Sequence, residues 1–181
     1  NGPHTLVGRQ LGIDWKVRHA EQAWTVHLPG CSVTQAQDRT DVLTQFPASR
    51  AFWDAQARAA DLCWSMAAQG LPWLPTTLAE AVQIAKTGLA HFPADVRLLP
   101  LLTSSVRDVM ARYGAADDAA FVRFIDAQLL ISAQTTSAHA NALYGVTALD
   151  LPRQGVVHVE GGIGGIAETL AQKVRDFGGK V

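Results

Sequence analysis

The chain has 181 residues, of which 48% are hydrophobic and 17% are charged, and its formal net charge is −1. This balance predicts a globular protein with a sizeable core and excludes disorder over most of the length. Lysine and arginine are scattered along the chain, so we expect no nucleic-acid partner. Cys31 and Cys63 lie far apart without neighbours at metal-ligand spacing, which predicts neither a disulfide framework nor a metal site.

Two long stretches, 62–79 and 127–149, carry no charged residue and are long enough to be candidate membrane spans. Gly70, Pro72 and Pro75 interrupt the first as a helix, and the second has a polar centre. The N-terminus lacks the basic and apolar regions of a signal peptide. These features, with the two isolated cysteines, favour a cytoplasmic protein.

The N-terminal part predicts a small antiparallel sheet between about Ile13 and Thr34. Apolar and polar residues alternate over 13–18 and again over 24–28, and a period of two is typical of a strand with one buried face. The pair Pro29-Gly30 has the residue types of a tight turn, after which a further strand can return.

From Asp41 onward, apolar residues recur at the three- and four-residue steps of helices. Capping residues at the starts and glycines at the ends support this interpretation. The expected helices run from Ser49 to about Gly70, from Thr77 to about His91, from Pro93 or Pro100 to Tyr113, from Asp117 past Leu130, and from Ser137 to Tyr144.

The C-terminal residues follow a different pattern. Gly155 to Val159 predicts a short strand, a glycine-rich run follows, and an amphipathic helix then ends at Gly178-Gly179. Lys180 and Val181 begin an extended segment, where the chain stops. Because a strand and helix of this kind need a following parallel strand, we expect the chain to be an inner piece of a longer protein.

The glycine run is the strongest chemical signal. Gly162, Gly164 and Ala167 fit the G-x-G-x-x-A form of a dinucleotide-binding loop, whose amides bind a pyrophosphate at a helix N-terminus. The acidic residue expected about 20 positions later falls at or beyond the end of the chain, and most of the chain precedes the loop. Two interpretations therefore remain. The Gly162–Gly164 loop could belong to a stand-alone dinucleotide-binding module, or its glycines could let the backbone lie close to a flat group.

Other polar residues give weaker signals. His139 lies near Ser137 in sequence, but no G-x-S-x-G elbow supports a hydrolase site with Asp117 or Asp150. Asp117-Asp118 is best interpreted as a helix N-terminus.

Three tryptophans, Trp53, Trp64 and Trp73, are candidates for lining an apolar pocket. Core packing is the more common role of such side chains.

The order of these segments resembles the phytoene desaturase-like family of FAD-dependent oxidoreductases, which are relatives of the flavin amine oxidases. The last of three matching stretches is the most specific, with two glycines, a helix, a Gly-Gly pair and a strand. The stretches are Leu11-Gly12-Ile13 with the hairpin 24–30 and Phe46-Pro47, the helical segment Pro93–Leu102, and Val159–Leu170 with Phe177–Val181.

The resemblance implies an α+β fold with two parts. Residues 1–150 would form a predominantly helical substrate-binding domain with a small antiparallel sheet. Residues 151–181 would form a partial β-α unit that returns into the FAD-binding domain. Gly161 and Gly162 would lie at the edge of the FAD site, and no residue is identified as catalytic.

The same resemblance implies an activity for the full-length parent. It would transfer hydride to FAD from a hydrophobic, isoprenoid- or carotenoid-like substrate, or isomerise that substrate. The present chain would supply substrate binding and is expected neither to act alone nor to bind FAD. A cytoplasmic protein with peripheral membrane contact is compatible with such a substrate. A helical interaction domain without enzymatic activity remains a further alternative.

Overall fold

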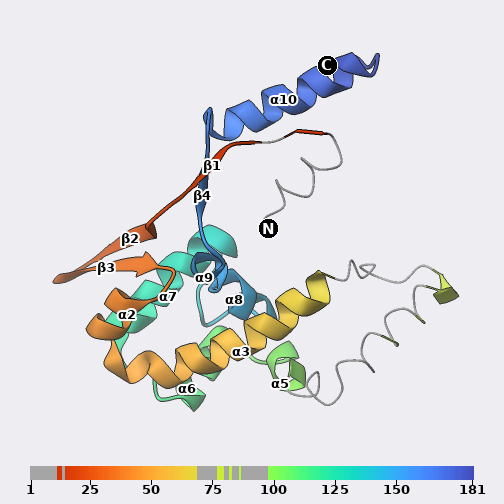
Figure 1. Ribbon diagram of the computed structural model, residues 1–181. Coiled ribbons are helices and arrows are strands. Elements are labelled where there is room, and N and C mark those ends of the chain that lie inside the picture. Colours follow the sequence, from red (N-terminus) through yellow and green to blue (C-terminus); the bar gives the residue numbers. More distant parts are fainter. Residues whose placement is uncertain (1–11, 14, 69–76, 80–81, 83–85, 87–97) are drawn as a thin grey trace.

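The computed structural model describes residues 12–13, 15–68, 77–79, 82, 86 and 98–181, and it has the expected α+β architecture (Figure 1). A helical body carries a β-hairpin, and a two-stranded ribbon leads from this body to a C-terminal helix. The described elements are β1 (Val17–His19), β2 (Gln22–Leu28), β3 (Cys31–Ala36), α2 (Thr40–Gln45), η1 (Pro47–Ser49), α3 (Arg50–Ala67), α5 (Leu99–Leu102), α6 (Val106–Arg112), α7 (Ala119–Ser132), α8 (Ala142–Ala148), α9 (Leu151–Gln154), β4 (Val157–Val159) and α10 (Gly162–Asp176).

The β2–β3 hairpin confirms the expected antiparallel strands and their turn. Leu28 pairs with Cys31 across the turn, where Gly30 has a φ of 88° that glycine accepts without strain. Val26 and Leu28 pack against the hydrophobic core, whereas Thr25 is exposed. The period of two in the sequence therefore corresponds to one face on the helical body and one in water.

The first strand, expected from Ile13, forms only over Val17–His19, and it does not pair with the β2–β3 hairpin. β1 pairs antiparallel with β4, so that Val17 lies opposite Val159 and His19 opposite Val157. The β-structure expected between Ile13 and Thr34 is thus divided between two separate two-stranded sheets. Alternation indicates which residues form a strand, but it carries no information about the distant strand that pairs with them.

An aromatic cluster forms the centre of the helical body. Phe46 and Phe121 have ring centroids 5.2 Å apart, and the rings of Phe52 and Trp53 meet edge to face at 5.1 Å. All four side chains are buried. Burial of such a side chain contributes about 1.5–3 kcal/mol, so this cluster links α3 to α7 strongly.

The long helix α3 starts directly after Ser49, as expected. The helix expected to run to Tyr113 is instead divided, and α6 begins anew after Ser105. The Ser105 hydroxyl accepts from the Asp108 N–H, and the Asp108 carboxylate accepts from the Ser105 N–H. This reciprocal capping box fixes a helix start that apolar periodicity alone does not reveal. Gly114, with a φ of 67°, follows the end of α6 as expected.

Two further helices begin later than expected. Asp118, rather than Asp117, caps α7, because its carboxylate accepts from the N–H groups of Ala120 and Phe121. The short helix expected over 137–144 is α8, which Asn141 caps. Of the helix expected from Thr77 to His91, the described residues 78, 79, 82 and 86 are helical, and its other residues from 80 onward lie outside the described residues. The end expected at Gly70 also lies outside them.

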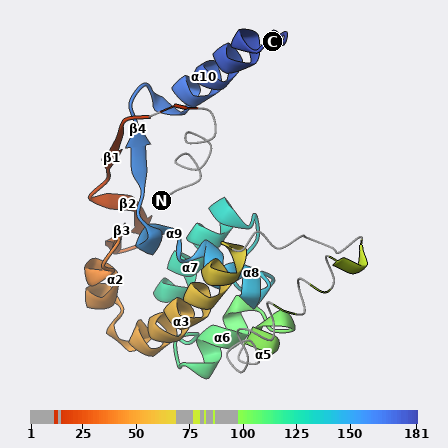
Figure 2. The same ribbon diagram turned by 45° about the vertical axis from the view of Figure 1, so that its right-hand side comes forward.

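The C-terminal helix stands apart from the helical body. Both views place α10 beyond the β1–β4 ribbon, on the side away from α3 and α8 (Figure 2). Its end near Gly178, which has a φ of 80°, agrees with the sequence. The ribbon also pairs residues from both sides of the boundary expected at residue 150.

Candidate functional site

The turn between β4 and α10 contains the glycines that the sequence indicated. Gly161 and Gly162 have φ of 83° and 73°, a conformation that strongly favours glycine. A Cβ added at either position would meet no atom within 4 Å. The Glu160 N–H donates to the Lys16 carbonyl at 3.0 Å. The turn is therefore held to the ribbon on one side and open on the other.

Helix α10 begins at this turn. No side chain among the described residues caps its first amides, and Gly164 also has open space where a Cβ would be. Uncapped amides and the helix dipole favour a negative or polar group at this end. The backbone of Gly161, Gly162 and the start of α10 therefore presents uncapped amides beside open space.

The strand that leads into the turn does not have dinucleotide-binding topology. Such a unit places its helix across two parallel strands. In the described part of the chain, β4 pairs only with β1, and that pairing is antiparallel. Within the described residues, the turn therefore lacks the parallel strand pair of a complete dinucleotide-binding unit.

Helix α10 has an apolar side that no described element covers. None of its residues is buried, Ile163 is 87% exposed, and Phe177 just beyond its end is 82% exposed. Leu170, Val174 and Phe177 border a shallow depression on this helix. Contiguous apolar exposure of this kind marks a surface that packs against something else.

A polar cluster around Asp150 joins distant parts of the helical body. The fully buried carboxylate accepts from the Arg153 Nε at 2.7 Å, from the Gln154 Nε2 at 2.7 Å and from the Trp64 Nε1 at 3.0 Å. Gln56 on α3 donates to the same carboxylate at 3.2 Å. Sequence reasoning missed this cluster, because its members lie up to 111 residues apart and form no local motif.

Burial and hydrogen bonding act against each other at Asp150. Burial favours the neutral carboxyl, but hydrogen bonds from Arg153, Gln154 and Gln56 outweigh it and hold the pKa of Asp150 below its usual range. The Arg153 guanidinium also pairs with Asp61 at the surface.

Arg39 supplies the second buried charge of this cluster. Its Nη2 lies 2.7 Å from the Gln56 Oε1 and 3.4 Å from the Asp150 Oδ1, and its guanidinium lies 4.3 Å from the centre of the Trp53 ring. Burial lowers the pKa of Arg39 to about 10 despite the opposing effect of Asp150. The Arg39 Nε is buried without a hydrogen-bond partner, whereas the Asp150 carboxylate is bonded to α3, α9 and Arg39 and so ties these segments together.

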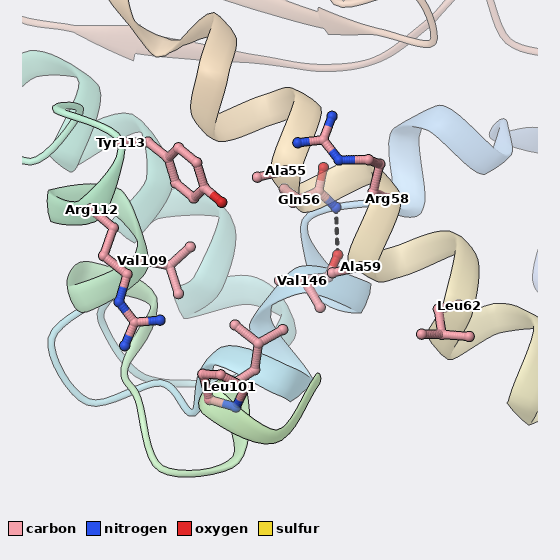
Figure 3. Close-up of a pocket in the computed structure, with 11 residues that line it drawn as sticks. Ala55, Gln56, Arg58, Ala59, Leu62, Leu101, Val109, Arg112, Tyr113 and Val146 are labelled. Carbon is pink, nitrogen blue, oxygen red and sulfur yellow. Dashed lines mark hydrogen bonds between the residues drawn. The ribbon is translucent and has the colours of Figure 1, made fainter. Parts of the chain in front are cut away.

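A cavity of about 310 Å³ opens between α3, α5, α6 and α8 (Figure 3). Leu62, Leu101, Val109 and Val146 provide apolar walls. Gln56, also at the wall, is already bonded to the Val146 carbonyl. The size lies at the lower end of the range for small-molecule sites.

The tryptophans take different positions. Trp53 is buried in the aromatic cluster, and Trp64 is half-buried with its Nε1 on Asp150. Neither lines the cavity, and Trp73 lies outside the described residues. The packing role is thus the one observed for Trp53.

The residues considered for a hydrolase are not arranged as one. Ser137 is buried, and its hydroxyl accepts from the Arg107 Nε at 3.0 Å. Its N–H donates to Asp126 at 2.7 Å. His139 and Asp117 are exposed, and no hydrogen bond joins either to Ser137 in the described structure. Ser137 therefore serves to fix the loop before α8.

The described residues contain no group of three or more His, Cys, Asp or Glu side chains that could hold a metal ion. Within the same residues, every helix is too short or too polar to cross a membrane. Comparisons with protein-family models, with curated proteins and with solved structures found no match to the chain.

Proposed function

We propose that this chain is the substrate-binding part of an FAD-dependent oxidoreductase of the phytoene desaturase kind, with residues 151–181 returning toward the cofactor domain. The observation that carries the proposal is the open turn at Gly161 and Gly162. Two successive glycines with positive φ stand at the start of a helix with uncapped amides, beside empty space. That combination suits the approach of backbone to a flavin ring.

The proposed division of labour follows from these positions. FAD, when bound, would supply the redox chemistry by accepting a hydride from a hydrophobic substrate. Gly161 and Gly162 would let the backbone lie against the flavin edge, and the first amides of α10 would donate to it. The helical body would provide apolar surface for an isoprenoid-like substrate. No side chain in the chain is assigned a proton-transfer role.

The uncovered side of α10 supports the same proposal. An amphipathic helix with Ile163 and Phe177 exposed needs an apolar partner surface, and the cofactor domain of a parent enzyme would provide one. The same observation also favours the second candidate, a helical interaction module without enzymatic activity. The two candidates differ in whether the glycine turn contributes to flavin binding.

Substitution of Gly162 by valine in the full-length parent separates these candidates. Gly162→Val places a branched side chain beside the turn, so we expect loss of bound flavin and of turnover per folded molecule, measured by flavin absorbance and substrate conversion. The matched control is Gly114→Val, since Gly114 also has positive φ and open space but lies after α6. Both variants carry a similar backbone strain of about 1–2 kcal/mol.

Equal flavin content and turnover in Gly162→Val, Gly114→Val and the unmodified enzyme would refute the proposed cofactor role. If both variants have lower melting temperatures but keep normal flavin content and turnover per folded molecule, the turn is structural and the interaction module is favoured.

A further inference from the structure

The cavity between α3, α5, α6 and α8 combines apolar walls with two cationic side chains. Arg58 reaches it from α3, and Arg112 and Tyr113 reach it from the end of α6. Figure 3 shows the Tyr113 hydroxyl turned toward α3, where Arg58 extends over the same space. None of the residues lining this cavity belongs to the segment 151–181, so the cavity is separate from the glycine turn.

The two arginines that line this cavity have N–H groups that bond to no described residue. Arg58 makes no ion pair or hydrogen bond with any described residue, and Asp61, one turn further along α3, is paired with Arg153 instead. Arg112 donates one Nη2 bond to the Ser104 hydroxyl at 2.7 Å, which leaves its other N–H groups available. The Tyr113 hydroxyl has no described partner either. Arg58 and the Tyr113 hydroxyl therefore have no acceptor among the described residues, at the edge of one apolar hollow.

We propose that this cavity binds a small amphipathic carboxylate, with its acyl chain against Leu101, Val109 and Val146 and its head group at Arg58 and the Tyr113 hydroxyl. Guanidinium groups bind carboxylates through paired, charge-assisted hydrogen bonds, and Tyr113 adds a neutral donor. The cavity volume of 310 Å³ equals that of about ten water molecules at ~30 Å³ each, so it suits a ligand of about ten non-hydrogen atoms. Octanoate, a saturated eight-carbon carboxylate, has that size.

The head group distinguishes this ligand from a neutral hydrocarbon. A hydrocarbon would fill the apolar walls but would make no charge-assisted hydrogen bond with Arg58. The proposal thus concerns a ligand other than the neutral substrate inferred above, and it stands whether or not the glycine turn faces FAD.

Titration of the 181-residue chain with octanoate and with 1-octanol tests the charge requirement. Methyl NMR signals of Val109 and Val146 report where each ligand binds, and the shift against concentration gives Kd. We expect octanoate to bind at least fivefold more tightly than octanol at low ionic strength. Added salt should weaken octanoate binding and leave octanol binding unchanged, since screening acts on the charged head group alone.

Variants assign the binding to this cavity. Arg58→Gln should raise the Kd of octanoate about three- to tenfold without changing that of octanol. Arg123→Gln is the matched control, because Arg123 is an exposed arginine on α7 that does not line the cavity. Ala59→Leu, which fills the hollow from α3, should weaken both ligands.

Three results would overturn the proposal: equal affinities for octanoate and octanol, equal effects of Arg58→Gln and Arg123→Gln, or unchanged Val109 and Val146 signals at saturating octanoate. Arg58→Gln is expected to keep the fold, since Arg58 has no described protein partner to lose.

Discussion

Asp150 links three segments of the helical body through one buried carboxylate. Its partners come from α3, from the loop after β3 and from α9, and their hydrogen bonds replace the water that the carboxylate loses. Arg39 adopts a left-handed φ of 57° at the start of α2, a backbone conformation uncommon outside glycine. The contacts with Gln56 and Trp53 hold its side chain in place.

Replacement of Asp150 by asparagine should destabilise the fold at neutral pH. The variant leaves Arg39 and Arg153 without their shared negative charge, and removal of one member of a buried ion pair costs about 3 kcal/mol. Urea unfolding of Asp150→Asn and the unmodified chain at pH 7 measures this difference. Asp176→Asn, on the exposed end of α10, should change stability by about 0.5 kcal/mol or less.

The difference in unfolding free energy between Asp150→Asn and the unmodified chain should also depend on pH. The pKa of Asp150 is lowered in the folded state, so the unfolded chain binds the proton more readily. The stabilisation is therefore complete above the ordinary carboxyl pKa of ~3.9 and is lost as pH falls through the lower folded value. A gap between Asp150→Asn and the unmodified chain that stays constant down to acidic pH would contradict this assignment.

Helix α8 packs closely against α6 at a glycine. A Cβ on Gly145 would overlap the buried Val106 side chain, and it would also approach Leu129. The close approach of these helices therefore depends on the missing side chain. Gly164 in α10 offers the opposite case, since a Cβ there meets no atom within 4 Å.

Alanine at these two positions should have opposite effects on stability. In a helix interior, alanine is favoured over glycine by about 1 kcal/mol, so Gly164→Ala should be neutral or slightly stabilising. Gly145→Ala should be destabilising by about 1–3 kcal/mol, because overpacking against Val106 exceeds that gain. Thermal unfolding followed by circular dichroism measures both. Equal midpoints for the two variants would show that α6 and α8 can separate at little cost.

The elements also show what the sequence could reveal. The β2–β3 turn at Pro29-Gly30 and the end of α6 at Gly114 were predictable, because each depends on residues that are neighbours in sequence. The pairing of β1 with β4 and the cluster at Asp150 were not, because each depends on residues more than a hundred positions apart. Gly161 and Gly162 stood out as residues, but their open surroundings became visible only in the fold.

The described part of the molecule has an open glycine turn but lacks the parallel strands that usually accompany a dinucleotide-binding loop. We expect the 181-residue chain to bind no FAD, since dinucleotide affinity in such proteins depends chiefly on a glycine loop between parallel strands and a following acidic residue. Titration with micromolar FAD should leave flavin fluorescence unquenched. Saturable quenching would contradict this expectation and favour the stand-alone dinucleotide-binding module.

The long sequence separations within the Asp150 cluster have a consequence for synthesis on the ribosome. Arg39 and Gln56 emerge 111 and 94 residues before Asp150. At about 5–20 residues per second, roughly 5–20 s pass before their shared carboxylate leaves the exit tunnel. Through that interval Arg39, which follows the hairpin, and Gln56 of α3 lack the Asp150 carboxylate to which both bond in the folded protein. The nascent chain therefore completes its helical body late, and the early half is the part that a chaperone would meet.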